Sequence, residues 1–310
     1  MSSVGVIYNC EGSGHAMRML SIAQRLEGRE VDCKLAGGGP GQKFLEANNV
    51  SNYTPETTDM RSLVDGRLTQ NSISTLKDPL DRVKHLMSWI EENDFDCIIS
   101  NDPCGLLAAR AKKIDFYVVS HVSKDIPVSR IESIATFLLN AAFIEEAEEF
   151  FYPSLWQSPN SGRLMKVGPL APEYKGEAEG EFEILVVPSA ISDNTETICK
   201  TLQEHGYTVK KVGGEDWSPK PSLRPYIRKA STVVCSGYST VMEASVERTP
   251  CILNPVTSEQ KGVSKKLEGI RGFREYSGSL SREISELQTP REYRNGAIDI
   301  ADAVIRDLRQ

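Results

Sequence analysis

The sequence predicts an α/β protein made of two Rossmann-like, doubly wound domains that face each other across a cleft. Three observations lead to this prediction. Short apolar runs alternate with amphipathic segments in both halves of the chain, which is the pattern of parallel βαβ units. The chain has 310 residues, whereas one domain usually has about 100–200. A polar, acidic segment at residues 174–183 separates the two alternating regions.

In the first half, short apolar runs predict buried strands, and apolar residues at helical spacing predict amphipathic helices. The expected strands cover residues 4–8, 31–36, 97–100 and 116–120. The expected helices cover residues 15–26, 42–48, 80–92 and 105–113.

The segment 174–183, YKGEAEGEFE, contains a single large apolar residue, Phe182, and is typical of an interdomain linker. We therefore expect one domain at residues 1–173 and a second at residues 184–310. In the second domain the expected strands cover 184–187, 208–212, 232–235 and 251–253, and the expected helices cover 193–205, 223–229 and 239–247. The tail 291–308 is predicted to be helical and could pack back across the linker.

Composition excludes several classes of protein. A net charge of -7 argues against a nucleic-acid partner, because phosphate backbones are bound by basic surfaces. The seven cysteines are scattered without a CxxC pair, as in reduced cytoplasmic proteins, and indicate neither a disulfide framework nor a zinc site. We find no pattern of a signal peptide and no apolar run long enough to span a membrane. We expect a cytoplasmic protein without a metal or cofactor.

The first candidate site is the loop from Asn9 to His15, between the first expected strand and helix. Gly12 and Gly14 would let the backbone approach a ligand closely, and a helix N-terminus attracts negative charge. The helix dipole disfavours a protonated His15, which suits a neutral base. The alternative is a tight turn with a capping histidine. The spacing differs from the GxGxxG of dinucleotide-binding proteins.

The second candidate site follows the expected strand 232–235. Gly237, Ser239 and Thr240 open a helix whose hydroxyl and N–H groups suit a diphosphate. Glu243, one turn further on, could accept hydrogen bonds from a ribose diol. Glu259 and Gln260 come after the next strand, at the sheet edge where α/β proteins bind ligands. The alternative is a capped helix with a solvated glutamate.

The order and spacing of these residues resemble the donor domain of GT-B glycosyltransferases related to MurG, glycosyltransferase family 28. The N-terminal loop is similar to the GxGHxxR form found in shorter archaeal and bacterial relatives. The matching positions are Gly12, Gly14, His15 and Arg18 in the first half, and Gly237, Thr240, Glu243, Pro250, Pro255 and Gln260 in the second. The Asn101–Asp102–Pro103 turn also resembles those relatives.

The resemblance implies a role for each matched residue. Glu243 would bind the ribose of a UDP-type donor, Ser239 and Thr240 its diphosphate, and Glu259 and Gln260 the sugar hydroxyls. His15 and Asp102 would stand at the reacting centre. Val187–Pro188–Ser189 replaces a glycine-rich loop of MurG, so Ser189 is a further donor-site candidate. His121 ends the expected strand 116–120 and lies at the edge of the cleft.

These expectations describe a metal-independent glycosyltransferase that moves a sugar from a nucleotide-sugar to a hydroxyl acceptor. Two alternatives stay open: a UDP-sugar hydrolase of the same fold, and a non-catalytic subunit that binds a sugar nucleotide. A lipid-linked acceptor, with peripheral contact to a membrane, is a further option that the sequence leaves open.

Overall fold

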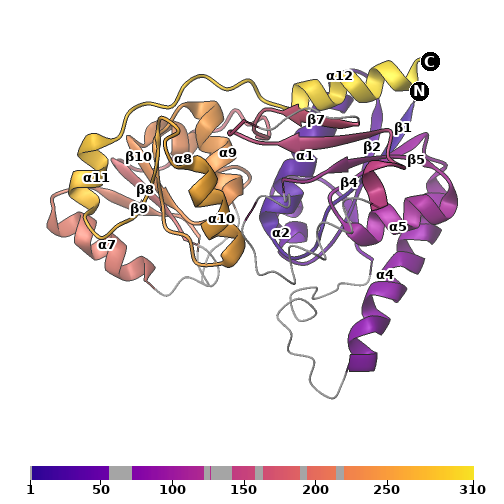
Figure 1. Cartoon of the computed structure of the whole chain (residues 1–310), viewed down its shortest axis with the longest axis horizontal. Helices are drawn as coiled ribbons and strands as arrows, with labels where there is room; N and C mark the ends of the chain where they lie inside the picture. The colour runs from indigo at the N-terminus through magenta and orange to yellow at the C-terminus, as the bar shows by residue number, and fades with distance from the viewer. Residues whose placement is uncertain are drawn as a thin grey trace.

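A computed structural model describes residues 2–55, 72–121, 126, 142–157, 163–188, 194–213 and 220–310 of the protein. The chain forms two bodies, each a parallel β-sheet with helices packed on it (Figure 1). The predicted pair of Rossmann-like halves is therefore confirmed. No helix among the described residues has the length and apolar character needed to cross a lipid bilayer.

The N-terminal sheet has seven strands in the order β3-β2-β1-β4-β5-β6-β7, and every pairing is parallel. All four residues of its central strand β4 are buried, because helices cover both faces of a parallel sheet. The strands are β1 (Ser3–Ile7), β2 (Asp32–Ala36), β3 (Asn52–Tyr53), β4 (Cys97–Ser100), β5 (Asp115–Val119), β6 (Glu149–Pro153) and β7 (Leu164–Val167). The helices are α1 (Ser13–Glu27), α2 (Pro40–Ala47), α4 (Ser72–Asn93) and α5 (Pro103–Lys112).

The C-terminal sheet has five parallel strands in the order β12-β11-β10-β8-β9. Its strands are β8 (Ile184–Val187), β9 (Val209–Lys211), β10 (Thr232–Cys235), β11 (Cys251–Leu253) and β12 (Phe273–Glu275). Its helices are α7 (Thr195–Glu204), α8 (Arg224–Lys229), α9 (Tyr238–Glu247), α10 (Ser258–Leu267) and α11 (Leu280–Glu286).

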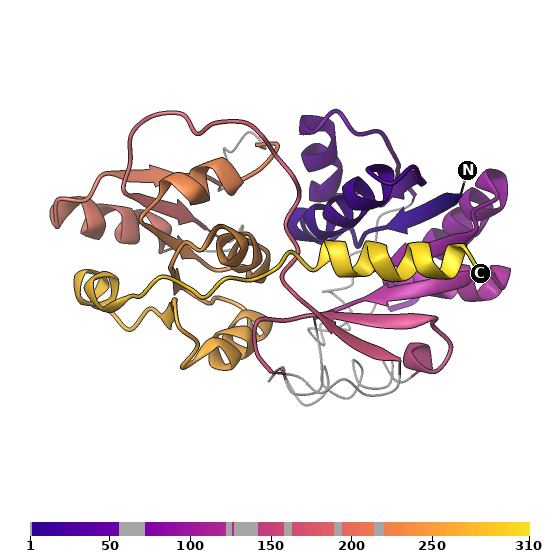
Figure 2. The same ribbon diagram turned by 90° about the horizontal axis from the view of Figure 1, so that it is seen from above.

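The chain passes between the two bodies twice, after β7 and again before the last helix α12 (Ala297–Leu308) (Figure 2). The two passages touch. The Asn295 side chain donates to the Ala171 carbonyl at 2.6 Å, and the Gly296 amide donates to the Pro169 carbonyl at 2.8 Å. A Cβ on Gly296 would lie 2.3 Å from the Gly168 carbonyl oxygen, so only glycine allows this approach.

The position of the last helix follows from its packing. Helix α12 lies within residues 184–310, but it packs on α1 and β7 of the N-terminal body. Its apolar face explains this position, since Ile300, Ala301 and Val304 are buried. The predicted return of the C-terminal tail across the linker thus places the last helix in the other body.

Strand order reverses at one point in each sheet, between β1 and β4 and between β8 and β10. Ligands of open α/β sheets bind outside the carboxyl ends of the strands at such points. The segments that follow β1, β4 and β10 carry most of the candidate residues. This topology decides which side chains can meet at the interface between the two bodies.

Candidate functional site

Helices α1 and α9 both begin at the interface between the two bodies. Their N-cap residues are Gly12 and Gly237, and neither helix start is capped by a side chain. A Cβ built on either glycine would meet no atom within 4 Å. The first amides of a helix have no partner within the helix and carry partial positive charge. Each helix start can therefore bind an anion.

The two helix starts touch each other. A Cβ on Gly14 would lie 2.1 Å from the Ser239 Oγ, so Ser239 occupies the space that any larger residue at position 14 would need. Thr240, the next residue of α9, is buried. The glycine loop and the hydroxyl-bearing helix start, which are 225 positions apart in sequence (239 − 14), thus come together in the fold.

A chain of four polar side chains crosses the interface next to this contact. Arg18 Nη2 lies 3.0 Å from His15 Nδ1, and Arg18 Nη1 lies 3.3 Å from His121 Nδ1. His121 Nε2 lies 2.7 Å from Glu259 Oε1. His15 and Arg18 belong to α1, His121 follows β5, and Glu259 lies in the first turn of α10. These four side chains therefore link the two bodies.

Burial and charge set the protonation of the two histidines and of Glu259. Burial and the charge of Arg18 lower the pKa of His15 to about 3. The pKa of His121 is also lowered, chiefly by burial, although its hydrogen bond to Glu259 acts in the opposite direction. Both imidazoles are therefore neutral at pH 7. Burial alone would raise the pKa of Glu259, but the hydrogen bond from His121 and the charge of Arg18 help to hold it below its ordinary value.

Tyr238 was not singled out by the sequence, yet it contacts the N-terminal body across the interface. It is the first residue of α9, and its ring packs against His121 and Trp156, with ring centroids 5.1 and 5.3 Å away. Its hydroxyl accepts from the Leu155 amide at 3.3 Å and donates to the Pro153 carbonyl at 3.4 Å. An aromatic residue directly before the Ser239–Thr240 pair is the only sequence signal for this contact.

Glu243 is buried in the C-terminal body, with 3% of its surface exposed. Burial raises its pKa to about 8, although the charge of Arg224 acts in the opposite direction. Its Oε1 atom has no hydrogen-bond partner among the described residues. A buried oxygen without a partner is costly unless the group is protonated or a ligand supplies a donor.

Asp102, an expected site residue, makes contacts that support the structure. Asp102 accepts from Arg82 Nε at 2.8 Å and caps α5 through the Cys104 amide at 2.9 Å. Both Arg82 and Asp102 are buried. These contacts hold Asp102 in place as a helix cap and ion-pair partner, so they do not support the role at the reacting centre that its turn suggested.

Gln260 forms a capping box at the start of α10, where its Oε1 accepts from the amides of Val256 and Thr257. Only its amide NH₂ group is left for a sugar hydroxyl. Ser189 lies outside the described residues. The described residues contain no cluster of His, Cys, Asp and Glu that could hold a metal ion.

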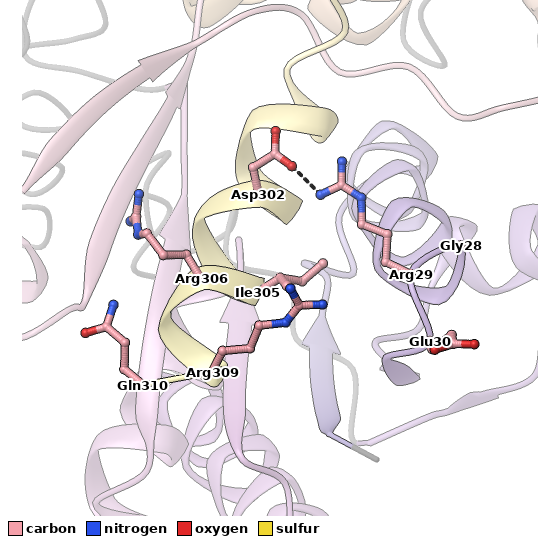
Figure 3. Close-up of a pocket in the computed structure, with 8 residues that line it drawn as sticks. All are labelled: Gly28, Arg29, Glu30, Asp302, Ile305, Arg306, Arg309 and Gln310. Carbon is pink, nitrogen blue, oxygen red and sulfur yellow. Dashed lines mark hydrogen bonds and ion pairs between the residues drawn. The ribbon is translucent and has the colours of Figure 1, made fainter.

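A cavity of about 870 Å³ lies at the other end of α1, between Gly28–Glu30 and α12 (Figure 3). Its walls include Arg29 and Asp302, which form an ion pair, and Arg306. With a rise of about 1.5 Å per residue, α1 separates this cavity from His15 by roughly 20 Å. It is not part of the interface site.

Solved structures resemble the chain over nearly its whole length. A Streptomyces glycosyltransferase complexed with thymidine diphosphate superposes with a TM-score of 0.68 and 13% identity, covering 99% of this chain and 100% of its own. MurG of Acinetobacter baumannii superposes with a TM-score of 0.61 and 13% identity, again covering 99% of this chain and 100% of its own. The chain has the GT-B fold.

The GT-B fold is shared by proteins with different named activities. The UDP-GlcNAc 2-epimerase of Methanocaldococcus jannaschii has a TM-score of 0.63 and 11% identity, and 99% of each chain is covered. No protein-family profile and no curated protein matches the sequence. At these identities the comparisons establish the GT-B fold alone.

Proposed function

We propose that the protein is a glycosyltransferase that moves a sugar from a nucleoside-diphosphate sugar, of the UDP type, to a hydroxyl acceptor. The observation that carries this proposal is the contact between two uncapped helix starts, α1 and α9, next to the chain of polar side chains. In transfer, the acceptor oxygen bonds to the anomeric carbon as the bond from that carbon to the diphosphate breaks, and the acceptor proton passes to the departing diphosphate or to water. The electron pair leaves with the diphosphate, where fixed positive dipoles stabilise it.

The donor half of the site is supported by three residues of α9. Ser239 and Thr240 bring hydroxyl and N–H groups to a helix start, which suits a diphosphate. Glu243, one turn further on, has the buried, unpartnered oxygen expected of a group that awaits a donor. A ribose diol offers two such donors. Gly12 and Gly14 would close over the diphosphate from the N-terminal body.

The reacting centre is supported by the polar chain. His15 would stand at this centre, while Glu259 and the Gln260 amide would bind hydroxyls of the donor sugar. Nearly half of the Glu259 side chain, 46%, is exposed, so a ligand can reach it. Helix dipoles can stabilise the leaving diphosphate without a metal, and we propose no cofactor.

None of the seven cysteines forms a disulfide in the structure, and most are buried, as in proteins of reducing compartments. We therefore propose that the enzyme works in the cytoplasm. A lipid-linked acceptor would require contact with a membrane surface.

A thermal-shift comparison of UDP, ADP, GDP and NAD tests the donor site. A ligand at about 100 times its dissociation constant stabilises a protein by about 2.7 kcal/mol, and we expect the largest shift with UDP. Equal or absent shifts for all four would remove the donor-site assignment. Incubation with UDP-sugars, with and without hydroxyl acceptors, then tests transfer. Release of UDP and free sugar at the same rate in both arms would indicate a hydrolase, and binding without turnover a non-catalytic subunit.

A further inference from the structure

Arg18 is a buried cation with two histidine partners. Only 5% of its surface is exposed, and it lies one helical turn after His15 on α1. Two different nitrogens of its guanidinium reach the Nδ1 atoms of His15 and His121, at 3.0 and 3.3 Å. A guanidinium has five N–H donors and no acceptor. Both histidine Nδ1 atoms must therefore accept these hydrogen bonds.

The second partner of the His121 ring agrees with this direction. A neutral imidazole with an accepting Nδ1 carries its proton on Nε2. His121 Nε2 lies 2.7 Å from Glu259 Oε1, and an ionised carboxylate can only accept. The side chain of Asn101 contacts the backbone of His15: Nδ2 donates to the His15 carbonyl at 3.3 Å, and Oδ1 accepts from the Asn9 amide at 2.8 Å.

Protonation of either ring is opposed by the same contact. A proton on Nδ1 would place an N–H against the N–H of the guanidinium, which removes a hydrogen bond and adds a like charge. Among the described residues, the other ionisable groups that face the rings are Glu259 on α10 and Tyr238 on α9, whose ring packs against His121. Only Glu259 favours a charged imidazole, and it contacts His121 directly.

We propose that Arg18 is a positioning residue that holds His15 and His121 neutral with the proton on Nε2, so that His15 offers a ligand an N–H donor and no lone pair. The consequence for catalysis rests on the proposed glycosyl transfer. A neutral histidine of this kind stabilises charge that develops on an oxygen, as in other enzymes whose histidine is kept neutral. It does not act as the base that takes the acceptor proton.

Histidine ¹⁵N NMR of the ligand-free protein tests the proposal without any substrate. The chain has only four histidines, so His15→Gln and His121→Gln assign the two signals. His205 gives an internal reference for the other tautomer, in which Nδ1 carries the proton. Its Nδ1 lies 2.7 Å from the Thr201 carbonyl and must donate to it. We expect His15 and His121 to show a protonated Nε2 and a bare Nδ1 from about pH 8 down to about pH 5.

Three variants show whether Arg18 sets this pattern. In Arg18→Met both histidines should titrate at a higher pH than in the parent and lose the fixed Nε2–H signature. Arg18→Lys keeps the charge but has a single nitrogen in place of the fork, so at most one of the two signatures should be retained. Arg25→Met, on the same helix and paired with Glu173 at 2.7 Å, should leave both signals unchanged. Circular dichroism establishes that each variant is folded.

The outcomes separate this proposal from the proposed function. A protonated Nδ1 on His15, or titration curves that Arg18→Met does not move, would overturn the role of Arg18 whatever reaction the protein catalyses. Once transfer has been measured, the pH–rate profile of the parent should lack a limb near pH 6.5, the ordinary pKa of histidine, and Arg18→Met should move the profile. A parent limb near pH 6.5 that His15→Gln abolishes would restore His15 as the base.

Discussion

The Oγ atom of Ser239 lies 2.1 Å from the point where a Cβ on Gly14 would stand. The Ser239 Cβ lies 2.9 Å from the same point, closer than real Cβ atoms approach, so rotation of the hydroxyl alone would not relieve the overlap. The first turns of α1 and α9 can thus meet only because position 14 has no side chain. This contact sets how closely the two bodies approach each other.

Gly14→Ala should therefore open the interface while leaving each body folded. A displacement of reacting groups by about 1 Å costs on the order of 10²-fold in rate, so we expect a loss of that order in kcat/KM for transfer. Small-angle X-ray scattering of the ligand-free variant should show a larger radius of gyration. Adding Ser239→Gly should restore the parent radius. An unchanged radius in Gly14→Ala would mean that the neighbouring residues absorb the methyl group.

Asp102 should matter for stability rather than for chemistry. It is the buried partner of Arg82, which has no exposed surface, and removing one member of a buried ion pair costs about 3–5 kcal/mol. We expect Asp102→Ala to lose stability of that order in urea denaturation. At a temperature where the variant is folded, its kcat should stay within about tenfold of the parent. A stable variant with turnover reduced by about 10⁴ would instead return Asp102 to the reacting centre.

The His121–Glu259 pair should couple the two bodies weakly. Because nearly half of the Glu259 side chain is exposed, we expect a coupling energy of about 0.5–1 kcal/mol in a double-mutant cycle of alanine variants. The contact keeps the pKa of Glu259 below its ordinary value of about 4.5. The coupling should therefore be present above that pH and decline as the pH falls below it.

A second cycle on Lys200 and Glu204 provides the comparison for this pair. These residues form an exposed pair at 3.8 Å within α7, and such pairs contribute about 0.3–0.5 kcal/mol. A coupling energy for His121–Glu259 no larger than this would show that the interdomain pair adds no more to stability than a surface contact.

The elements with clear periodicity could be predicted from the sequence. Strands β4, β8, β10 and β11 have the expected bounds, because a fully buried parallel strand is a continuous apolar run between turns. Strand β6 could not be predicted. It begins at Glu149, the last residue of the acidic run 145–149, which suggests a solvated surface, whereas in the structure it is an inner strand between β5 and β7 and its apolar residues are buried.

The site was predictable where a residue follows a strand or opens a helix. That rule locates Gly14, Ser239 and Glu259 at the interface. It does not reveal which hydrogen-bond or ion-pair partners a side chain has in the fold. By the same rule Asp102 and Gln260 are expected to face a ligand. In the structure Asp102 pairs with Arg82, and Gln260 caps α10. In the sequence Arg18 is recognisable only as part of the GxGHxxR motif, because its two histidine contacts depend on the tertiary fold.

Binding of UDP should release a proton near pH 7 if Glu243 binds the ribose. In the ligand-free protein burial raises the pKa of Glu243 to about 8, so most of the protein holds this carboxyl in its protonated form at pH 7. A carboxylate that accepts two hydrogen bonds from a diol must give up that proton. Calorimetric titration of UDP in two buffers of different ionisation enthalpy measures the release, and UDP affinity should increase as the pH rises towards 8.

The raised pKa of Glu243 also predicts how this residue affects the stability of the fold as the pH changes. The folded carboxyl titrates near 8 and the unfolded carboxyl near 4.5, so its contribution to folding is complete below pH 4.5 and is lost as the pH rises through 8. Glu243→Gln removes this loss and should make the protein more stable than the parent at pH 8. The variant should bind UDP more weakly by about 1–3 kcal/mol, the cost of losing charge-assisted hydrogen bonds, and should release no proton.

Glu283→Gln is the matched control, because Glu283 is equally buried, at 3%, in the same body but belongs to α11. It should leave both UDP affinity and proton release unchanged. If Glu243→Gln instead unfolds the protein, the buried carboxyl is structural. If it stays folded and binds UDP as tightly as the parent, the ribose is held by other groups, and the donor site must be sought away from α9.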